Sequence, residues 1–335
     1  MNSAIVGCGG IAHVHADALR QMDGVKLCAF TDIRPERAEE FVTQFGDENS
    51  HAYQNFEQML EQEQIDVLHI CTPHYLHVPM AIAALEKGIN VFMEKPPAIS
   101  MDQLSELNRV KKNAALGVCF QNRYNASVRQ VKSLLDSGKA GKVLGARAFV
   151  TWHREAPYYT ESGWRGSIAT EGGGVLINQS IHTLDLLKYF LGMPEKIEGT
   201  VINHHLKGVI EVEDTAEAYL LYPDKVALFY ATTAFCTDSP VMVELVCEKM
   251  TIRMEETKLT ITEKGKPSKE MDFSVPANSV GKAYWGNGHM ACIADYYDCL
   301  KNNRRFPVTI ESAGETLRLM RGIYESYNRK APVIL

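Results

Sequence analysis

The sequence predicts an α/β protein with two domains: an N-terminal doubly wound parallel sheet of the Rossmann type, and a C-terminal α+β domain with an open, mostly antiparallel sheet. The chain has 335 residues, which exceeds the usual size of one hydrophobic core. Apolar strands alternate with amphipathic helices up to about residue 122, and strand-like runs dominate the chain after it. We therefore place the two domains at 1–122 and 123–335.

The alternation of strand and helix in the first domain favours a parallel sheet with helices on both faces. Strands are expected at the short apolar runs 4–6, 25–31, 65–71, 90–93 and 117–120. Helices are expected between them at 11–22, 35–45, 77–87 and 101–113. Pro35 suits the first turn of its helix and Ser100 suits an N-cap, so two of the helix starts have a chemical signal.

The second domain combines a few helices with many runs of β-branched and aromatic residues. Helices are expected at 125–137, and at 289–301 and 311–328, where they close the chain. Strands are expected at 144–152, 216–222, 226–233, 241–247, 250–254 and 258–263. Consecutive strands of this kind, with a Pro-Asp turn at 223–224 between two of them, indicate an antiparallel sheet.

Composition and charge restrict the function classes. The net charge is −6, so we expect no basic surface for nucleic acid or for an anionic membrane. The eight cysteines include no C-x-x-C pair, which favours reduced thiols of a cytoplasmic protein and no zinc or other metal site. The first residues enter a strand at once, and no apolar window is long enough for a bilayer, so neither a signal peptide nor a membrane span is expected.

A glycine motif lies between the first strand and the first helix, where Gly7, Gly9 and Ala12 form G-x-G-x-x-A. Gly7 permits a tight turn, Gly9 lets a pyrophosphate approach the backbone, and Ala12 permits close packing of the helix. Gly10 and Ile11 complete the turn at the helix N-terminus, which favours an anion. A glycine turn of some other α/β protein is the alternative, but the position of the motif favours a dinucleotide site.

An acidic residue at the end of the second strand supports the same site. Asp32 lies 20 residues after Ala12, where an acid accepts hydrogen bonds from the adenosine ribose hydroxyls. Its charge would repel a 2′-phosphate, so NAD is favoured over NADP. Arg34 and Arg37 follow closely, and because an arginine at this place can receive the phosphate, NADP stays the less favoured alternative.

Ligands bind at the carboxyl ends of strands in open parallel sheets, so the residues after the third long strand are candidates for cofactor contacts. Cys71, Thr72 and Pro73 would line the cofactor there. His77 would contact the nicotinamide half or cap the next helix, and a solvated turn histidine is the alternative.

The next strand ends in Glu94-Lys95-Pro96-Pro97. The two prolines hold the lysine backbone at the strand end, where Glu94 and Lys95 would reach the cofactor. A lysine beside a cationic nicotinamide has a lowered pKa, which suits proton transfer. The alternative is a loop lysine exposed to water.

Residues 171–187, EGGGVLINQSIHTLDLL, resemble a buried helix that is interrupted by Asn178, His182 and Asp185. On a helix these positions are i, i+4 and i+7 and form one stripe. A buried polar stripe must meet protein groups, water or a ligand. We expect an active-site wall, in which Asn178 binds substrate and Asp185 orients the helix or the imidazole, rather than a hydrogen-bonded core histidine. The glycines are expected to let the chain pass close to cofactor and substrate.

Further candidates lie at the domain junction and in an aromatic stretch before the glycines. Asn122 and Arg123 follow the last strand of the first domain and would reach the cofactor, and Tyr124 would reach the substrate. Aromatic faces and a guanidinium suit a polyhydroxylated ligand. The substrate-binding candidates in this stretch are His153, Trp164 and Arg165, with surface aromatics or an oligomer contact as the alternative.

Glu94-Lys95-Pro96 after a Rossmann half, followed by GGG-x-x-x-N-x-x-x-H-x-x-D, resembles the Gfo/Idh/MocA oxidoreductase family over essentially the whole chain. The resemblance implies a C-terminal α/β domain with an open sheet, through which homodimers or homotetramers form. It also implies oxidation or reduction of a sugar, cyclitol or related compound with NAD(H) or NADP(H). Matched by position, Lys95 is the lysine of the family's E-K-P motif and His182 its active-site histidine. Asn178 falls where many members, inositol dehydrogenases among them, have an Asp, which argues against an inositol substrate.

We therefore expect an NAD(P)-dependent oxidoreductase that transfers hydride between nicotinamide and a secondary hydroxyl or carbonyl of a sugar, cyclitol or sugar derivative. His182 or Lys95 would take the hydroxyl proton: His182 has the better pKa for a base near neutral pH, and Lys95 would then stabilise the charge on oxygen. The alternatives are a redox-neutral, NAD-dependent glycoside-cleaving enzyme of the same superfamily and a non-catalytic nucleotide and sugar sensor. The sequence leaves open the substrate, its stereochemistry, the direction of reaction and the formal base.

Overall fold

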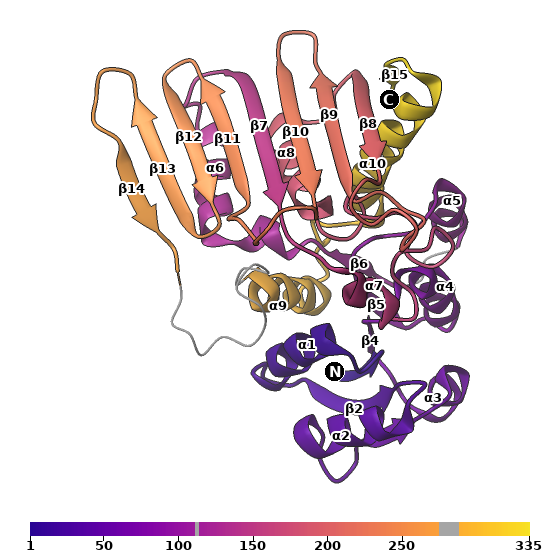
Figure 1. The fold of residues 1–335 in the computed structure, drawn as a ribbon. Helices are drawn as coiled ribbons and strands as arrows, with labels where there is room; N and C mark the ends of the chain where they lie inside the picture. Colours follow the sequence, from indigo (N-terminus) through magenta and orange to yellow (C-terminus); the bar gives the residue numbers. More distant parts are fainter. Residues whose placement is uncertain (111–113, 275–287) are drawn as a thin grey trace. The chain divides into compact units, whose positions relative to one another are not determined.

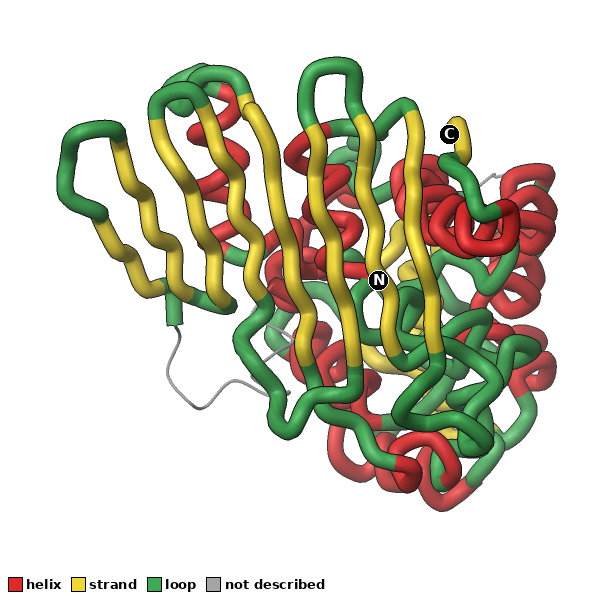
Figure 2. Tube along the Cα trace, turned by 45° about the horizontal axis from the view of Figure 1, so that its top comes forward, coloured by secondary structure: helices red, strands yellow, loops and turns green. Residues whose placement is uncertain are grey.

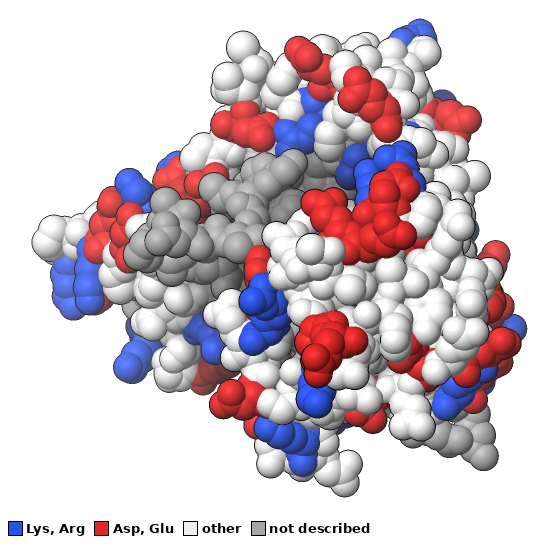
Figure 3. All heavy atoms as spheres, turned by 90° about the horizontal axis from the view of Figure 1, so that it is seen from below, with Lys and Arg blue, Asp and Glu red and all other residues white. Residues whose placement is uncertain are grey.

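The computed structural model describes residues 1–110, 114–274 and 288–335. The chain forms two compact units, Met1–Gln121 with Ala277–Gly314, and Asn122–Pro276 with Glu315–Leu335 (Figure 1). None of the described helices is both long and apolar enough to cross a membrane. On the face drawn in Figure 3, acidic and basic side chains are interspersed.

The first unit contains a six-stranded sheet in which all neighbours are parallel. Its strands are β1 (Asn2–Val6), β2 (Lys26–Thr31), β3 (His51–Tyr53), β4 (Val67–Ile70), β5 (Asn90–Glu94) and β6 (Leu116–Cys119). The order is β3-β2-β1-β4-β5-β6, which reverses direction between β1 and β4. This confirms the predicted doubly wound Rossmann sheet, and ligands of such sheets bind beside that reversal.

Helices and short 3₁₀ turns lie between these strands or, for the turn η2 (Gln121–Tyr124) and the helix α9 (Gly288–Lys301), after them in the chain. Those between the strands are α1 (Gly10–Arg20), α2 (Pro35–Phe45), α3 (Phe56–Gln62), α4 (His77–Glu86) and α5 (Met101–Arg109), with the turn η1 (His74–Leu76). Pro35 begins α2, and the Ser100 side chain caps α5 by accepting from the Gln103 N–H, as expected. The predicted end of the latter helix, 111–113, lies outside the described residues. β3 and α3 were not predicted. β3 is a short, exposed edge strand without an apolar pattern, and α3 has only seven residues.

Helix α9 packs on the first unit, although the predicted second domain includes it. Tyr296 Oη donates to the carbonyl oxygens of Val91 and Ala115, at 2.9 and 3.0 Å. Gly117 leaves room for this ring, since a Cβ there would lie 2.7 Å from it. A single domain boundary in the sequence cannot describe this packing, because α9 and the strands that it contacts are far apart in the sequence.

The second unit contains a nine-stranded open sheet (Figure 2). Its strands are β7 (Val143–Thr151), β8 (Lys196–Ile202), β9 (Thr215–Leu221), β10 (Val226–Thr232), β11 (Met242–Cys247), β12 (Met250–Glu255), β13 (Lys258–Glu263), β14 (Lys269–Asp272) and β15 (Val333–Ile334). The order is β14-β13-β12-β11-β7-β10-β9-β8-β15. Neighbours are antiparallel except the central pair β7 and β10, which is parallel. The predicted mostly antiparallel sheet is confirmed.

Helices α6 (Ala126–Asp136), α8 (Ile181–Leu191) and α10 (Ile310–Arg329) lie against one face of this sheet, and α7 (Ala156–Thr160) precedes the glycine segment (Figure 1). Alternate residues of the strands are buried, as a sheet covered on one face requires. In β9, for example, Ala216, Ala218 and Leu220 are buried. Tyr219 of the same strand is 50% exposed on the other face.

Candidate cofactor-binding and catalytic residues

The turn between β1 and α1 has the form that the glycine motif predicts. Gly7 has φ of 87°, and a Cβ on it would lie 2.8 Å from the carbonyl atoms of Cys71. A side chain is therefore excluded by both conformation and space. At Gly9 and Gly10 a Cβ would meet nothing within 4 Å, so the N-terminus of α1 is open to an approaching group. These residues fit a dinucleotide pyrophosphate. Ala12, in the first turn of α1, is fully buried.

Asp32, directly after β2, is joined to this turn. One carboxylate oxygen accepts from the Cys8 N–H and the other from the Arg34 N–H, both at 2.9 Å. A carboxylate can accept about four hydrogen bonds, so these two contacts orient Asp32 and leave it capacity for ribose hydroxyls. Arg34 is exposed and Arg37 half-buried at the start of α2, and the alternative of a phosphate contact therefore remains.

The loops after β4 and β5 are held together by His77. Its Nδ1 lies 2.9 Å from the Pro96 carbonyl oxygen and its Nε2 lies 2.9 Å from that of Thr72. Burial lowers the pKa of His77, and a neutral imidazole donates only one hydrogen bond. The ring is fully buried between these carbonyls. Only one of these two contacts can therefore be a hydrogen bond, while the ring packs between the two loops. The cofactor contact expected for His77 stays a prediction.

Thr72 is better placed for a ligand than its neighbours. Its Oγ1 is buried and has no hydrogen-bond partner among the described residues, and a buried hydroxyl without a partner is unfavourable unless a ligand or water satisfies it. The Cys71 side chain, by contrast, is buried, and burial raises the pKa of its thiol. Cys71 therefore has a packing role, and Pro73 is half-buried beside it.

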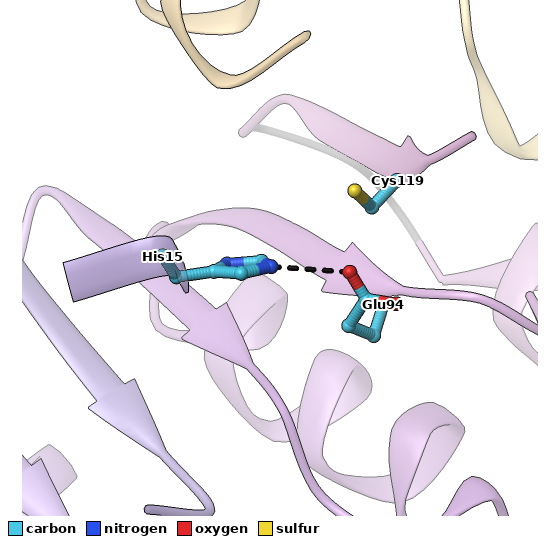
Figure 4. Close-up of side chains that lie close together, drawn as sticks. All are labelled: His15, Glu94 and Cys119. Atoms are coloured by element: carbon cyan, nitrogen blue, oxygen red, sulfur yellow. Dashed lines mark hydrogen bonds and ion pairs between the residues drawn. The ribbon is translucent and has the colours of Figure 1, made fainter. Parts of the chain in front are cut away.

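Glu94, the last residue of β5, faces inward. Its Oε1 accepts from His15 Nε2 at 3.1 Å (Figure 4). His15 Nδ1 lies 2.9 Å from His69 Nδ1, and His69 Nε2 lies 2.9 Å from Tyr297 Oη. Although burial disfavours the charged ring, contacts with Cys119 and Glu94 raise the pKa of His15 to about 9. Glu94 thus holds His15 beside Lys95, which is half-buried, and the cofactor contact expected for Glu94 stays a prediction.

His15, Glu94 and Cys119 also form a group with metal-ligand chemistry. Each offers one ligating atom, and these atoms lie within 4.8 Å of one another (Figure 4). Imidazole, carboxylate and thiolate are all zinc ligands. The expectation of no metal site was based on the spacing of the cysteines in the sequence. Such spacing cannot reveal a group whose three residues come from separate helices and strands. His15 Nε2 and Glu94 Oε1 of this group are hydrogen-bonded to each other.

The segment before α8 differs from the predicted continuous helix. The helix begins at Ile181, and Asn178 lies in the preceding turns. Glu213 Oε1 accepts from the N–H groups of Gly174 and Leu176, both at 3.0 Å, and Ser180 N–H reaches the carbonyl oxygen of Val175, five residues back, at 2.9 Å. These bonds wind residues 172–180 into turns, so the predicted stripe is wrong for Asn178.

Two of the glycines have no room for a side chain. A Cβ on Gly173 would lie 2.2 Å from Tyr324 Oη, and one on Gly174 would lie 2.0 Å from the Glu213 carbonyl oxygen. Both close neighbours belong to this unit. Protein packing therefore requires glycine at these two positions, and the expected proximity of the segment to cofactor and substrate stays a prediction.

Asp185 binds Arg123, not an imidazole. The carboxylate accepts from Arg123 Nε at 2.7 Å and from Nη2 at 2.6 Å. It also accepts from Thr316 Oγ1 at 2.6 Å. Although burial opposes ionisation, the guanidinium holds the pKa of Asp185 below its usual value. One edge of the Arg123 guanidinium is engaged in this buried ion pair, and the cofactor contact expected for Arg123 stays a prediction.

Several predicted substrate residues do gather in the second unit. Asn178 Nδ2 donates to Glu171 Oε1 at 2.6 Å, and the Arg165 guanidinium carbon lies 4.5 Å from the ring centroid of Tyr158 and 4.7 Å from that of Trp164. Tyr158 Oη accepts from Gln179 Nε2 at 3.1 Å. Glu171 was not singled out from the sequence, where an acid before three glycines looks like a solvated loop residue.

Other candidates have different surroundings. His153 Nδ1 lies 2.5 Å from the Phe235 carbonyl oxygen and Nε2 lies 3.3 Å from Glu155. The Tyr124 ring is buried and stacks under Arg129 of α6, at 4.9 Å. Asn122 Oδ1 is buried without a hydrogen-bond partner in the described part of the chain, which fits a ligand. His182, the second residue of α8, is half-buried.

Comparisons with known proteins follow this division into two units. Residues 1–121 match the model of an oxidoreductase family with an NAD-binding Rossmann fold, and residues 128–253 match the GFO/IDH/MocA C-terminal domain. D-glucoside 3-dehydrogenase of Escherichia coli is 31% identical over 57% of this chain and 54% of its own length. Glucose-6-phosphate 3-dehydrogenase of Bacillus subtilis is 29% identical over 66% of this chain and 64% of its own length. The chain thus spans about half to two thirds of the curated relatives it matches.

Solved structures with the same fold cover the whole chain. Levoglucosan dehydrogenase in complex with NADH and levoglucosan has a TM-score of 0.89 at 20% identity, over 100% of this chain and 99% of that one. The WlbA dehydrogenase of Bordetella pertussis, in complex with NADH and UDP-GlcNAcA, has a TM-score of 0.85 at 24% identity, over 99% of this chain and 98% of that one. With its glycine turn, its two-domain fold and both family matches, the chain belongs to the GFO/IDH/MocA oxidoreductase family.

Proposed function

We propose that this protein is an NAD-dependent dehydrogenase that transfers hydride between nicotinamide and a secondary hydroxyl or carbonyl of a sugar or sugar derivative, with NADP as a less favoured cofactor. The observation that carries the proposal is the turn at Gly7, where neither backbone conformation nor space admits a side chain, directly before an open helix N-terminus. The relatives named above act on glucosides and glucose 6-phosphate, which favours a carbohydrate as substrate.

In this proposal the first unit holds the cofactor. The α1 N-terminus binds the pyrophosphate, Asp32 accepts from the ribose hydroxyls, and the Thr72 hydroxyl donates to or accepts from the cofactor. Bound NAD supplies an acceptor for the carbinol hydride. The half-buried Lys95 and the half-buried His182 are the groups that handle the hydroxyl proton.

The two proton-handling groups have different chemistry. An unperturbed imidazole titrates near neutral pH, so a histidine such as His182 is suited to act as a general base. The ammonium of Lys95 suits stabilisation of the developing charge on oxygen. The Asn178 amide cannot relay a proton and therefore positions a substrate hydroxyl. Whether His182 or Lys95 is the formal base is a question for the pH profiles of the variants below.

The test is turnover of a panel of sugars, cyclitols and glycosides with NAD⁺ and NADP⁺, followed at 340 nm. We expect Lys95→Ala and His182→Ala to lower kcat/KM by about 10²-fold or more, the usual loss of a general acid or base. Exposed Lys87 and His204 provide the matched controls Lys87→Ala and His204→Ala, with activity within about twofold of wild type. Unchanged turnover of Lys95→Ala would remove the proton-transfer role.

A second candidate is the redox-neutral enzyme that cleaves a glycoside after transient oxidation. A protein named 2,7-anhydro-N-acetylneuraminate hydratase, from Mediterraneibacter gnavus, is 29% identical over 59% of this chain and 51% of its own length. Such an enzyme yields product without net NADH, so product analysis beside the absorbance assay separates the two candidates. Ligand binding without turnover of any compound would favour the non-catalytic sensor.

We further propose that the protein is a homodimer or homotetramer that associates through the face of the nine-stranded sheet opposite its helices. Leu144, Tyr219, Val226 and Val246 are between 41% and 54% exposed on the strands of that sheet, and large exposed apolar side chains mark interaction surfaces. Light scattering coupled to size exclusion measures the mass. Tyr219→Lys is expected to lower it, and a monomeric wild type would refute the proposal.

A further inference from the structure

We propose that Glu171 is a positioning residue for Asn178: it anchors the amide nitrogen of Asn178, so that the amide oxygen accepts a hydrogen bond from a substrate hydroxyl, as a carboxylate at that position would. The inference rests on the proposed function, since it assumes that Asn178 contacts the substrate. The amide of Asn178 carries no charge, and the buried acid seven residues earlier is in hydrogen-bond contact with it.

The contacts of an ionised Glu171 allow one orientation of the amide. Glu171 is fully buried. Its Oε2 accepts from the Gly166 N–H at 2.6 Å, and its Oε1 lies 2.6 Å from Asn178 Nδ2. An ionised carboxylate only accepts hydrogen bonds, so the amide NH₂ must face Glu171, and the reverse orientation would put two acceptor oxygens in contact. Because the amide is planar, Asn178 Oδ1 then points away from Glu171.

The charges around Glu171 make this anchor dependent on pH. Burial is the largest effect and raises the pKa of Glu171 to about 7, although the hydrogen bonds from Gly166 and Asn178 and the charge of Arg165 act against it. Glu213 acts in the same direction as burial, and the phenols of Tyr158 and Tyr159 on α7 also face the group. A protonated Glu171 would donate a hydrogen bond and would no longer select the NH₂ side of the amide.

The consequence is a specific substrate requirement. A fixed, uncharged acceptor selects a substrate hydroxyl that donates a hydrogen bond. A deoxy analogue lacks that donor and loses this hydrogen bond, which costs affinity in the transition state. The nearby Arg165, held over Tyr158 and Trp164, gives the same region a planar cation for a second polar group of the ligand.

An exchange of the two side chains tests the inference. Asn178→Asp puts a second carboxylate in hydrogen-bond contact with Glu171, where the amide nitrogen now lies at 2.6 Å. Since like charges at this distance cannot both ionise, the two carboxyls share one proton, which can lie on either group. Position 178 then no longer presents a fixed acceptor, and we expect kcat/KM to fall by about tenfold or more. In Glu171→Gln/Asn178→Asp the glutamine oxygen can accept from Gly166 while its NH₂ donates to the carboxylate introduced at position 178. We expect this double variant to recover activity to within about threefold of wild type, mainly through KM for the sugar.

The pH profile gives a second readout. Wild type should show an ionisation near pH 7 in kcat/KM from Glu171, and the double variant should lack it. Glu161→Gln, an exposed acid at the end of α7, is the matched control. If wild type turns over no carbohydrate, the proposed function fails. If wild type is active and the double variant is no better than Asn178→Asp, whether inactive or unfolded, the positioning role of Glu171 is refuted and the proposed function stands.

Discussion

The buried ion pair between Arg123 and Asp185 gives the sharpest stability prediction. Asp185 is 1% exposed and accepts three hydrogen bonds, two from Arg123 and one from Thr316. Asp185→Ala leaves the guanidinium buried without its carboxylate, and Lys188, whose Nζ lies 3.7 Å from Asp185, loses a partner too. Removing one partner of a buried pair costs about 3–5 kcal/mol. We therefore expect the free energy of unfolding of the second unit to fall by about 4 kcal/mol.

Urea unfolding followed by tryptophan fluorescence measures this change, because Trp152 and Trp164 lie in the second unit. The matched control is Asp136→Ala, which removes the exposed i,i+4 partner of Lys132. An exposed helical pair contributes about 0.3–0.5 kcal/mol, so this variant should unfold almost as wild type does. Arg123→Met/Asp185→Leu removes both charges and should lose much less than Asp185→Ala.

The pH dependence has a defined sign. Since the folded pKa of Asp185 is lowered, its contribution is present above the unfolded carboxyl pKa of about 4 and is lost as pH falls through the folded value. The gap between wild type and Asp185→Ala should therefore close in acid. A loss below about 1 kcal/mol at pH 7 would contradict a stabilising role for the pair. A change in the pH profile of turnover would instead support the earlier expectation that Asp185 orients an imidazole.

Three further predictions concern the first unit. Gly7→Ala should weaken NAD binding by about tenfold or more, because a Cβ there would clash with Cys71. Gly24 has a similar φ but no neighbour within 4 Å, so Gly24→Ala is the control and should bind NAD normally. Calorimetry measures both affinities. Asp32→Ser should lower the preference for NAD over NADP by about tenfold, measured as the ratio of kcat/KM values, and a wild type that prefers NADP would refute the role of Asp32. His15 has a pKa raised to about 9, so its stabilisation is complete below about pH 6.5 and is lost as pH rises through 9. Thermal unfolding should show a loss of roughly 3 kcal/mol across that range, and a curve that His15→Gln leaves unchanged would contradict this.

Much of the fold could be predicted because its signals are local. The bounds of α2 follow from Pro35 and an amphipathic period, and most strands of the second unit coincide with β-branched runs. The glycine motif predicted the turn before α1 for the same reason, since the conformation of Gly7 and the space around it are properties of one strand–turn–helix unit.

The site was predicted less completely. Asn178, Trp164 and Arg165 were expected to bind substrate, and the structure brings them together. The acid that holds Asn178 was missed, because nothing in the letters EGGG distinguishes a buried carboxylate from a solvated one. The protein contacts of His77 with Pro96 and Thr72, and of Glu94 with His15, could not be predicted either, because each joins separate elements.

Local sequence accounts for the order of strands and helices, the Rossmann turn and the residue types available for chemistry. Those properties depend on dihedral preferences and on periodicity within a few residues. The tertiary structure, in contrast, determines which side chains contact one another. Asp185 binds Arg123, which precedes it by 62 positions in the sequence. Likewise, α9 belongs to the first unit although it lies near the end of the chain. Such partners are selected by the desolvation of charge and by the packing of apolar surface, and both depend on distances in the folded chain that local sequence does not contain.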